Sequence, residues 1–198
     1  MAPTPSQRAH DAESAILRSA RHEIETQGIL GLRVAEVAAG ANCSITQIYR
    51  YFGDRDGLLA RVLGDHYEES IEKAFHAYME RMRSLDVITV DDIVNTLPTP
   101  SAYATMKGQE IRLQILAVSV TNKQLRERIE QISQSHIALW EEGLDFVESR
   151  LEKGVRLDRR VFTIVLLVQN MYYRTLLGDK GFTDEEYQQF LRDTLVLR

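Results

Sequence analysis

The sequence predicts an all-α protein, with a small N-terminal helical domain followed by a larger helical domain. Three observations support this fold class. Apolar residues recur at steps of three and four along most of the 198 residues, which is the period of a helix. Only four prolines and eleven glycines are present to interrupt helices. The chain also lacks the alternation of apolar and polar residues that half-buried strands produce.

The bulk composition is that of a globular protein, with 44% hydrophobic and 27% charged residues. Cys43 is the single cysteine, which excludes an internal disulfide and fits a reducing compartment. The longest apolar run, at 161–168, is too short to span a membrane, and residues 1–14 lack the apolar core of a secretory signal. We therefore expect a cytoplasmic protein without membrane contact.

The small domain is expected to cover residues 11–64, after a flexible arm at residues 1–10 that contains two prolines. Its first helix ends near the glycines at 28–31. The apolar stripe of this helix consists of Ile16, Leu17, Ala20 and Ile24. A second, short helix is predicted around residues 34–38.

A tight turn separates the second helix from a third one at residues 45–52. Asn42 lies in this turn, where a residue tolerant of left-handed backbone geometry is needed. Ser44 is a good N-cap for the third helix, and Asp54 can cap a fourth helix that opens at Arg55. Helix, turn and helix in this order form the helix-turn-helix plan.

The third helix carries an unusual density of hydrogen-bonding side chains. Cys43, Ile48 and Phe52 are expected to face the small core. The other side chains face partly or wholly outward, namely Ile45, Thr46, Gln47, Tyr49, Arg50 and Tyr51. Glutamine bonds adenine edges, threonine offers a hydroxyl or methyl group, and tyrosine and arginine reach phosphates. The pattern therefore predicts that this helix reads double-stranded DNA.

The charge distribution permits DNA binding without favouring it. Residues 1–64 hold equal numbers of basic and acidic side chains, so the whole formal charge of −5 lies in residues 65–198. The acidic residues 65–198 repel DNA. The neutral N-terminal residues 1–64 can still bind it, because they carry arginines near the third helix.

The larger domain, residues 65–198, is expected to consist of long helices. A strongly amphipathic helix is predicted over 66–82 from apolar residues at steps of three and four. The sequence LPTP at 97–100 is the clearest break in the chain, and another helix begins near Ser101. Helical spacing then continues across 124–153.

The helix predicted at 161–177 has two apolar stripes, so it must be covered on two sides. Packing against a second copy of the chain, together with helix 124–153, explains this pattern better than a monomeric core. The expected homodimer interface comprises Leu139, Val147, Leu151, Val161, Val165, Val168 and Tyr172. The sequence leaves open which face of 161–177 makes the contact. A capping box at 183–186 opens a final helix.

Aromatic and polar side chains of the larger domain are candidates for the lining of a ligand cavity. They are Tyr78, Met82, Tyr103, Met106, Trp140, Gln169, Tyr172 and Tyr173. The same spacing serves a dry core equally well, so both interpretations stay open. His136, on the inner stripe of helix 124–153, is expected to be a core or interface histidine rather than a ligand contact.

The motifs of common enzyme classes are missing from the sequence. It contains no G-x-S-x-G, no glycine-rich phosphate loop, no H-E-x-x-H and no cysteine pair for zinc. The five histidines lack metal spacing, and the pair Glu72 and His76 is expected to lie on a helix surface. We therefore expect no catalytic residue, no metal site and no cofactor.

Residues 12–64 resemble the DNA-binding domain of TetR-type transcriptional regulators. The shared pattern comprises a first helix ending near a glycine, V-A at 37–38, A at 41, S at 44, I-Y-x-Y-F at 48–52 and R-D-x-L-L at 55–59. The aromatic element ending in Phe52, followed by a basic residue and a leucine, is its most specific part. The rest of the chain matches the family only in its helical architecture.

The resemblance implies a role for each matching position. Ser44 caps the recognition helix, and Thr46 and Gln47 lie at base-facing positions. Tyr49 contacts a phosphate. Arg55 occupies the usual lysine place at the start of the fourth helix, also against a phosphate.

Four positions differ from the family pattern. Arg50 replaces a frequent histidine and keeps a place at the rim of the groove. Asn42 replaces a turn glycine. Arg33 replaces a threonine or serine cap of the second helix, so a cap is lost while a phosphate contact is gained. Ile45 replaces a basic or polar residue and offers a contact to a thymine methyl group.

The resemblance implies a homodimeric regulator, by default a repressor. A small apolar or amphipathic effector would release it from a palindromic operator by tilting helix 66–82. The competing interpretation is a helical ligand-binding protein or enzyme that keeps the fold without sequence-specific DNA binding. Two features favour that alternative: residues 1–64 have no net charge, and Ile45 replaces a basic or polar residue.

Overall fold

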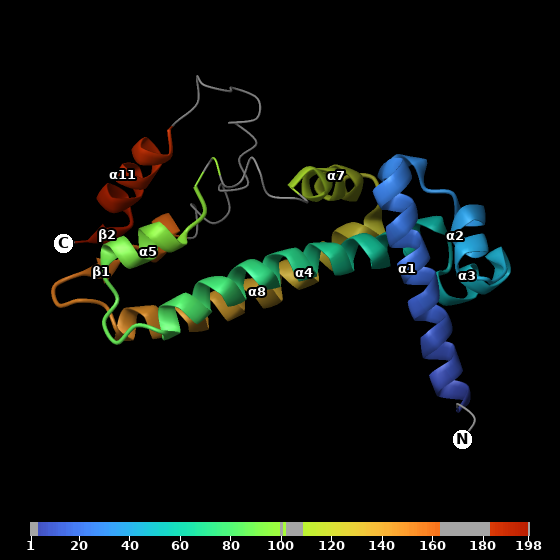
Figure 1. The fold of residues 1–198 in the computed structure, drawn as a ribbon, viewed down its shortest axis with the longest axis horizontal. Coiled ribbons are helices and arrows are strands. Elements are labelled where there is room, and N and C mark those ends of the chain that lie inside the picture. The colour runs from blue at the N-terminus through green and yellow to red at the C-terminus, as the bar shows by residue number, and fades with distance from the viewer. Residues whose placement is uncertain (1–3, 100, 102–108, 163–182, 198) are drawn as a thin grey trace. The chain divides into compact units, whose positions relative to one another are not determined.

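The computed structural model describes residues 4–99, 101, 109–162 and 183–197 (Figure 1). Within these ranges the chain consists of helices joined by short connections, with one pair of two-residue strands. The predicted all-α fold class is confirmed. Several predicted site residues lie outside the described residues: Tyr103, Met106, Val165, Val168, Gln169, Tyr172 and Tyr173.

The chain packs as two compact units, and each unit is made of two chain segments. The first, here called the head unit, comprises residues 1–69 and 113–133. The second, here called the body unit, comprises residues 70–112 and 134–198. Three helices, α4 (Arg55–Arg83), α7 (Gln109–Ser119) and α8 (Lys123–Ser149), contribute residues to both units.

Helix α1 (Pro5–Gly31) opens the head unit. The hydroxyl of Thr4 accepts a hydrogen bond from the Gln7 amide at 3.2 Å, and proline at the first helical position needs no amide partner. The flexible arm predicted for residues 1–10 is therefore wrong from Pro5 onward. Gly28 has a φ of 75° and kinks the helix near its end, where the sequence predicted a glycine stop.

Helices α2 (Val34–Gly40) and α3 (Ile45–Phe52) follow, with the tight turn that the sequence predicted between them. Asn42 has a φ of 51°, the left-handed geometry expected at this position. The head unit is completed by the first part of α4, the second half of α7 (Gln109–Ser119) and the first turns of α8. Its buried apolar side chains come from all these helices and include Ile16, Val37, Ile48, Leu58, Ile115 and Leu125.

The body unit contains the second part of α4, α5 (Val90–Thr96), the second part of α8 and α11 (Asp184–Thr194). Helix α5 begins with a capping box in which Thr89 and Asp92 bond each other's backbone amides. Strands β1 (Arg156–Leu157) and β2 (Val196–Leu197) pair antiparallel. The capping box predicted at Thr183 and Glu186 is confirmed at the start of α11.

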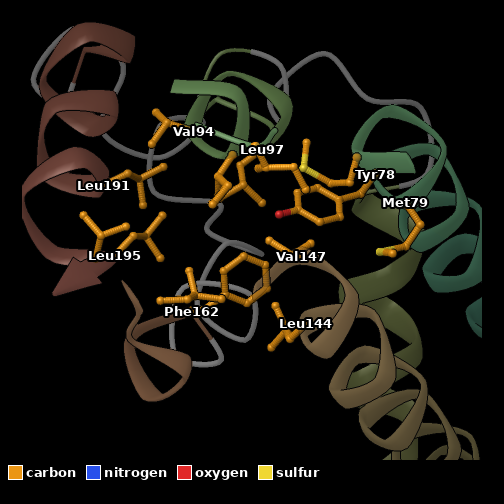
Figure 2. Packing of buried hydrophobic residues seen from close by; sticks show 14 of the residues in the cluster. Tyr78, Met79, Val94, Leu97, Leu144, Val147, Phe162, Leu191 and Leu195 are labelled. Atoms are coloured by element: carbon orange, nitrogen blue, oxygen red, sulfur yellow. The ribbon is translucent and has the colours of Figure 1, made fainter. Parts of the chain in front are cut away.

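A hydrophobic core joins the elements of the body unit (Figure 2). It collects side chains from α4, α5, α8, α11 and both strands around Phe162, whose side chain is fully buried. Tyr78 and Met82, two of the candidate ligand contacts, belong to this core.

Two residues of the predicted dimer interface lie elsewhere than the sequence suggested. Helix α8 ends at Ser149, so Leu151 is outside the helix and forms an isolated parallel bridge with Ile88 instead. Val147 has no exposed surface, because it packs inside the core of the body unit. The prediction that its side chain meets a partner chain is therefore wrong. Leu139 and Val161 are partly buried against the same core.

Candidate functional site

Helix α3 is a two-turn element that is fixed at both ends. The Ser44 hydroxyl accepts a hydrogen bond from the Gln47 amide at 3.1 Å, so the predicted N-cap is present. At the other end Gly53 has a φ of 80°, and its amide donates to the Tyr49 carbonyl at 2.8 Å. Ile48 is fully buried and therefore fixes which face of the helix looks outward.

The outward face of α3 carries the side chains predicted to read DNA. Ile45, Thr46, Tyr49 and Arg50 are exposed, while Gln47 and Tyr51 are half-buried. Tyr49 is 40% exposed and Ile45 41% exposed, so both large side chains are available to a partner. The Arg50 guanidinium lies 5.4 Å from the centre of the Tyr51 ring, a cation–π contact that restrains both side chains.

Two arginines from outside α3 were also predicted to contact DNA. Arg33 is exposed and precedes α2 without forming a side-chain cap, as its identity predicted. Arg55 is half-buried, and its Nη2 donates to the Leu32 carbonyl at 3.5 Å, near the length limit of a hydrogen bond. A hollow of about 200 Å³ adjoins Arg55. Its guanidinium is therefore weakly held and has room to turn.

Gly57 allows the chain to turn closely from α3 into α4, a role that the sequence analysis missed. A Cβ atom at this position would lie 1.9 Å from the carbonyl oxygen of Phe52 and 3.0 Å from Oε1 of Gln124. The Gly57 amide donates to Oδ1 of Asp54 at 2.7 Å, which is the predicted cap of α4. The R-D-x-L-L pattern leaves this position open, so nothing in the sequence indicates that glycine is needed there.

Asn122, between α7 and α8, is a second residue that the sequence analysis missed. It is buried, with 4% exposure. Apart from Tyr78, no other polar residue that the structure describes is buried to this degree. Its Nδ2 donates to the Asp56 carbonyl at 3.0 Å, and its Oδ1 accepts from the Leu125 amide at 2.9 Å. The Asn122 amide group thus joins the start of α8 to the first turn of α4, one residue after Arg55.

An ion-pair cluster links the same two helices further along. Arg128 on α8 donates through Nη2 to Oδ1 of Asp65 at 2.7 Å and to Oε2 of Glu68 at 3.1 Å, both on α4. Arg61 bonds the other Asp65 oxygen at 2.9 Å. Gly64 makes room for the Arg128 side chain, since a Cβ there would lie 2.5 Å from Cδ of Arg128.

The body unit contains a separate cluster of aromatic rings. Trp140 lies at its centre, with its ring 4.9 Å from Phe75, 5.3 Å from Tyr78 and 5.6 Å from Phe162 between centroids. These separations are typical of favourable aromatic pairs. The indole Nε1 of Trp140 donates to Nε2 of His136 at 2.8 Å, one helical turn earlier on α8. His136 is thus half-buried, and its Nε2 has a hydrogen-bond partner.

The hydroxyl of Tyr78 is the exception in this cluster. It is buried and has no hydrogen-bond partner among the residues that the structure describes, and Figure 2 shows its oxygen among carbon side chains of the core. Burial raises the pKa of this hydroxyl, so it stays a neutral donor at physiological pH. An unpartnered buried hydroxyl costs about 1–3 kcal/mol, which marks Tyr78 as the polar group of this core that a ligand would satisfy.

Half-burial lowers the pKa of His136 below its ordinary value of 6.5. The charges of Arg112 and His76 lower it as well, while Glu72 acts in the opposite direction. His136 is therefore neutral in the folded protein at neutral pH. Its neutral Nε2 accepts the indole hydrogen bond, which leaves the proton on Nδ1.

Stability is expected to fall as the pH drops below about 6.5 through the His136 contribution. The unfolded chain takes up a proton there that the folded chain resists, so unfolding becomes more favourable in acid. Chemical denaturation of the wild type and of His136→Gln between pH 7.5 and 5 measures this effect. The variant should lose less stability over that interval than the wild type. His22→Gln, at an exposed position, serves as the control and should follow the wild type. If the free energy of unfolding changes equally with pH in all three proteins, the loss of stability in acid does not come from His136.

Among the residues that the structure describes, no group of three or more histidine, cysteine or acidic side chains is arranged to hold a metal ion. No helix among them is long and apolar enough to cross a membrane.

Comparison with known families gives one match, which covers the N-terminal part of the chain. Residues 16–62 match the family described as bacterial regulatory proteins, tetR family. This range contains α2, α3, Gly57 and the arginines at positions 33, 50 and 55. A search of curated proteins gave no match.

Solved structures resemble the whole chain in fold. A multidrug binding protein, EbrR, complexed with imidazole gives a TM-score of 0.62 at 18% identity, covering 100% of this chain and 99% of that one. A transcriptional regulator from Saccharomonospora viridis in complex with choline gives 0.58 at 19%, covering 96% and 100%. A TetR-family regulator from Rhodococcus sp. gives 0.56 at 19%, covering 93% and 96%. At these identities the likeness establishes the shared fold.

Proposed function

We propose that the chain, whose residues 16–62 match the tetR family of bacterial regulatory proteins, is a ligand-responsive repressor that binds a palindromic DNA operator as a homodimer. The outward face of α3 is the observation that carries this proposal. Its capped N-terminus and its buried anchor Ile48 hold Thr46, Gln47 and Tyr49 in a fixed orientation. A rigid helix of this kind suits insertion into the major groove.

Each residue of this face has a proposed role that follows from its chemistry. Gln47 and Thr46 read base edges, and the exposed Ile45 contacts a thymine methyl group. Tyr49, Arg50 and Tyr51 contact phosphates beside the groove, and Arg33 and Arg55 extend these contacts along the backbone. The Ser44 cap directs the N-terminus of α3, with its partial positive charge, towards the DNA.

Homodimerisation gives the proposed repressor its palindromic site, because two copies of α3 related by a two-fold axis read two equal half-sites. Leu139 and Val161 remain the proposed interface residues among those that the structure describes. They are partly buried against the body core, so part of each side chain remains for a partner.

The proposed effector is a small amphipathic molecule that binds at the aromatic cluster of the body unit. The partly buried Trp140 contacts the buried rings of Phe75 and Phe162, and the Tyr78 hydroxyl has no hydrogen-bond partner among the described residues. Two proteins of the same fold were solved in complex with imidazole and with choline, which supports a small molecule as the proposed effector. An effector releases the operator only if it binds the released conformation better than the DNA-bound one.

Selection from a random duplex pool tests the DNA-binding part of this proposal. We expect the wild type to enrich a palindromic sequence, and its affinity for that sequence to fall steeply with salt, since phosphate contacts release counterions. Tyr49→Ala and Arg55→Ala should each weaken binding about tenfold. Arg55→Ala should also reduce the salt slope by about one, whereas replacing the uncharged Tyr49 should leave the slope unchanged.

Lys123→Gln is the matched control, because it removes a positive charge from the head unit at a position outside the proposed contacts. Its affinity should stay close to that of the wild type. If the folded wild type enriches no sequence, or if the two alanine variants bind as well as the wild type, the repressor mechanism is wrong. The neutral head would then belong to a ligand-binding protein without sequence-specific DNA recognition.

A further inference from the structure

We infer that Asn122 and Arg128 are positioning residues for DNA binding, which fix the first turns of α4 and thereby the place of Arg55. This inference rests on the proposed DNA-binding function. Both residues lie more than sixty positions after Arg55 in the sequence, outside the range that matches the family. All the contacts that support it lie inside the head unit.

The side-chain amide of Asn122 bonds two helices at the same time. Its Oδ1 caps the start of α8 by accepting from the Leu125 amide at 2.9 Å, which fixes the orientation of the amide group. The opposite side of the group, Nδ2, then points at the Asp56 carbonyl and donates to it at 3.0 Å. Asn122 is buried, so water does not compete for this hydrogen bond.

The Asp56 carbonyl belongs to the residue that directly follows Arg55. A hydrogen bond to it restrains the rotation and translation of the first turn of α4. The other restraint on that turn is the Asp54 cap, in which Oδ1 accepts from the Gly57 amide at 2.7 Å. Within the described residues, the Arg55 side chain itself has one long hydrogen bond, 3.5 Å to the Leu32 carbonyl. Its position therefore depends on the backbone that carries it.

Arg128 holds the next part of α4 through Asp65 and Glu68. Gly57 and Gly64, two turns apart on α4, leave the space that α8 occupies at both places. A Cβ on Gly57 would approach Gln124, and one on Gly64 would overlap Arg128. Close packing, the buried amide and the ion pair together set the register between α4 and α8 within the head unit.

Asn122→Asp tests this inference with almost no change in shape. The aspartate still caps α8, but it lacks the Nδ2 donor and places a second acceptor against the Asp56 carbonyl. We expect the affinity for the selected duplex to fall about tenfold and the salt slope to fall by about one, as in Arg55→Ala, because a displaced Arg55 no longer neutralises its phosphate.

A double-mutant cycle with Arg55→Ala separates positioning from general destabilisation. If Asn122 acts by placing Arg55, removing Arg55 first should abolish most of the loss caused by Asn122→Asp. Additive losses would show that Asn122 does not act through Arg55, and would overturn the inference.

Arg128→Gln provides a second variant if Asn122→Asp fails to fold. It should weaken DNA binding severalfold, whereas Lys123→Gln, with the same change in charge in the first turn of α8, should not. Equal affinities for Arg128→Gln, Lys123→Gln and wild type would contradict the inference while leaving DNA binding itself established. A wild type that selects no duplex would instead remove the proposed function, and the inference with it.

Discussion

Gly57→Ala is expected to destabilise the head unit by about 3 kcal/mol and to abolish tight operator binding. Alanine normally stabilises a helix by about 1 kcal/mol relative to glycine, so helix propensity alone predicts that the substitution would stabilise the head unit. Here the added Cβ would lie 1.9 Å from the Phe52 carbonyl oxygen, a backbone atom that cannot move without shifting the end of α3. The recognition helix would be displaced together with this turn.

Urea denaturation and duplex binding of Gly57→Ala measure the two effects. The matched control is Gly28→Ala, the same substitution at a glycine where nothing lies within 4 Å of the added atom. That variant has no steric overlap and bears only the cost of a backbone geometry that favours glycine (φ 75°, ψ 167°), about 1–3 kcal/mol, so it should retain DNA binding. A Gly57→Ala protein that is as stable as the wild type would mean that the turn between α3 and α4 is not closely packed.

Tyr78→Phe is expected to stabilise the protein without effector by about 1–3 kcal/mol. The substitution removes a buried hydroxyl that has no partner in the described part of the chain, and it keeps the ring next to Trp140 and Phe162. Most substitutions in a core destabilise the protein, so a gain in stability would show that the buried Tyr78 hydroxyl destabilises the folded state. Such a cost is expected where a residue serves a function, which is here the proposed effector contact. The same variant should respond more weakly to effectors that accept a hydrogen bond.

Chemical denaturation of Tyr78→Phe tests this prediction, with Tyr49→Phe as the control. Tyr49 is exposed on α3, so loss of its hydroxyl should change the free energy of unfolding by less than about 0.5 kcal/mol. A destabilised Tyr78→Phe would show that the hydroxyl already has a partner in the folded protein, and it would remove the main support for effector binding at this position.

The sequence predicted those parts of the head unit that depend on neighbouring residues. The Ser44 cap, the left-handed Asn42 and the missing cap at Arg33 each follow from the chemistry of one side chain next to its own backbone. The burial of Ile48 follows from helical spacing alone. Local rules determine these features, so a single sequence is enough to find them.

The features that the sequence did not reveal depend on contacts between distant segments. Nothing near Asn122 indicates that its amide would meet Asp56, and the glycines at 57 and 64 resemble ordinary helix-weakening residues until α8 is placed beside them. The early start of α1 was missed because two prolines suggested a flexible arm. One of them, Pro5, instead occupies the first helical position.

The helical spacing that continued to Leu151 was misleading for a related reason. Apolar periodicity records which residues are buried, and a residue just beyond a helix is also buried when it pairs with another segment, as Leu151 does with Ile88. For the same reason periodicity cannot tell a dimer contact from a monomer core, and Val147 proved to be the latter.

The head unit draws on two stretches of chain, residues 1–69 and 113–133, and this has a consequence for its synthesis. A ribosome releases the recognition helix long before it releases Asn122 and Arg128. The first stretch must therefore wait for more than forty further residues before its packing is complete. A nascent chain stalled before residue 113 should be sensitive to protease in α1–α4, and one stalled well after residue 133 should be resistant there. Transplanting the head onto another protein would likewise require both stretches.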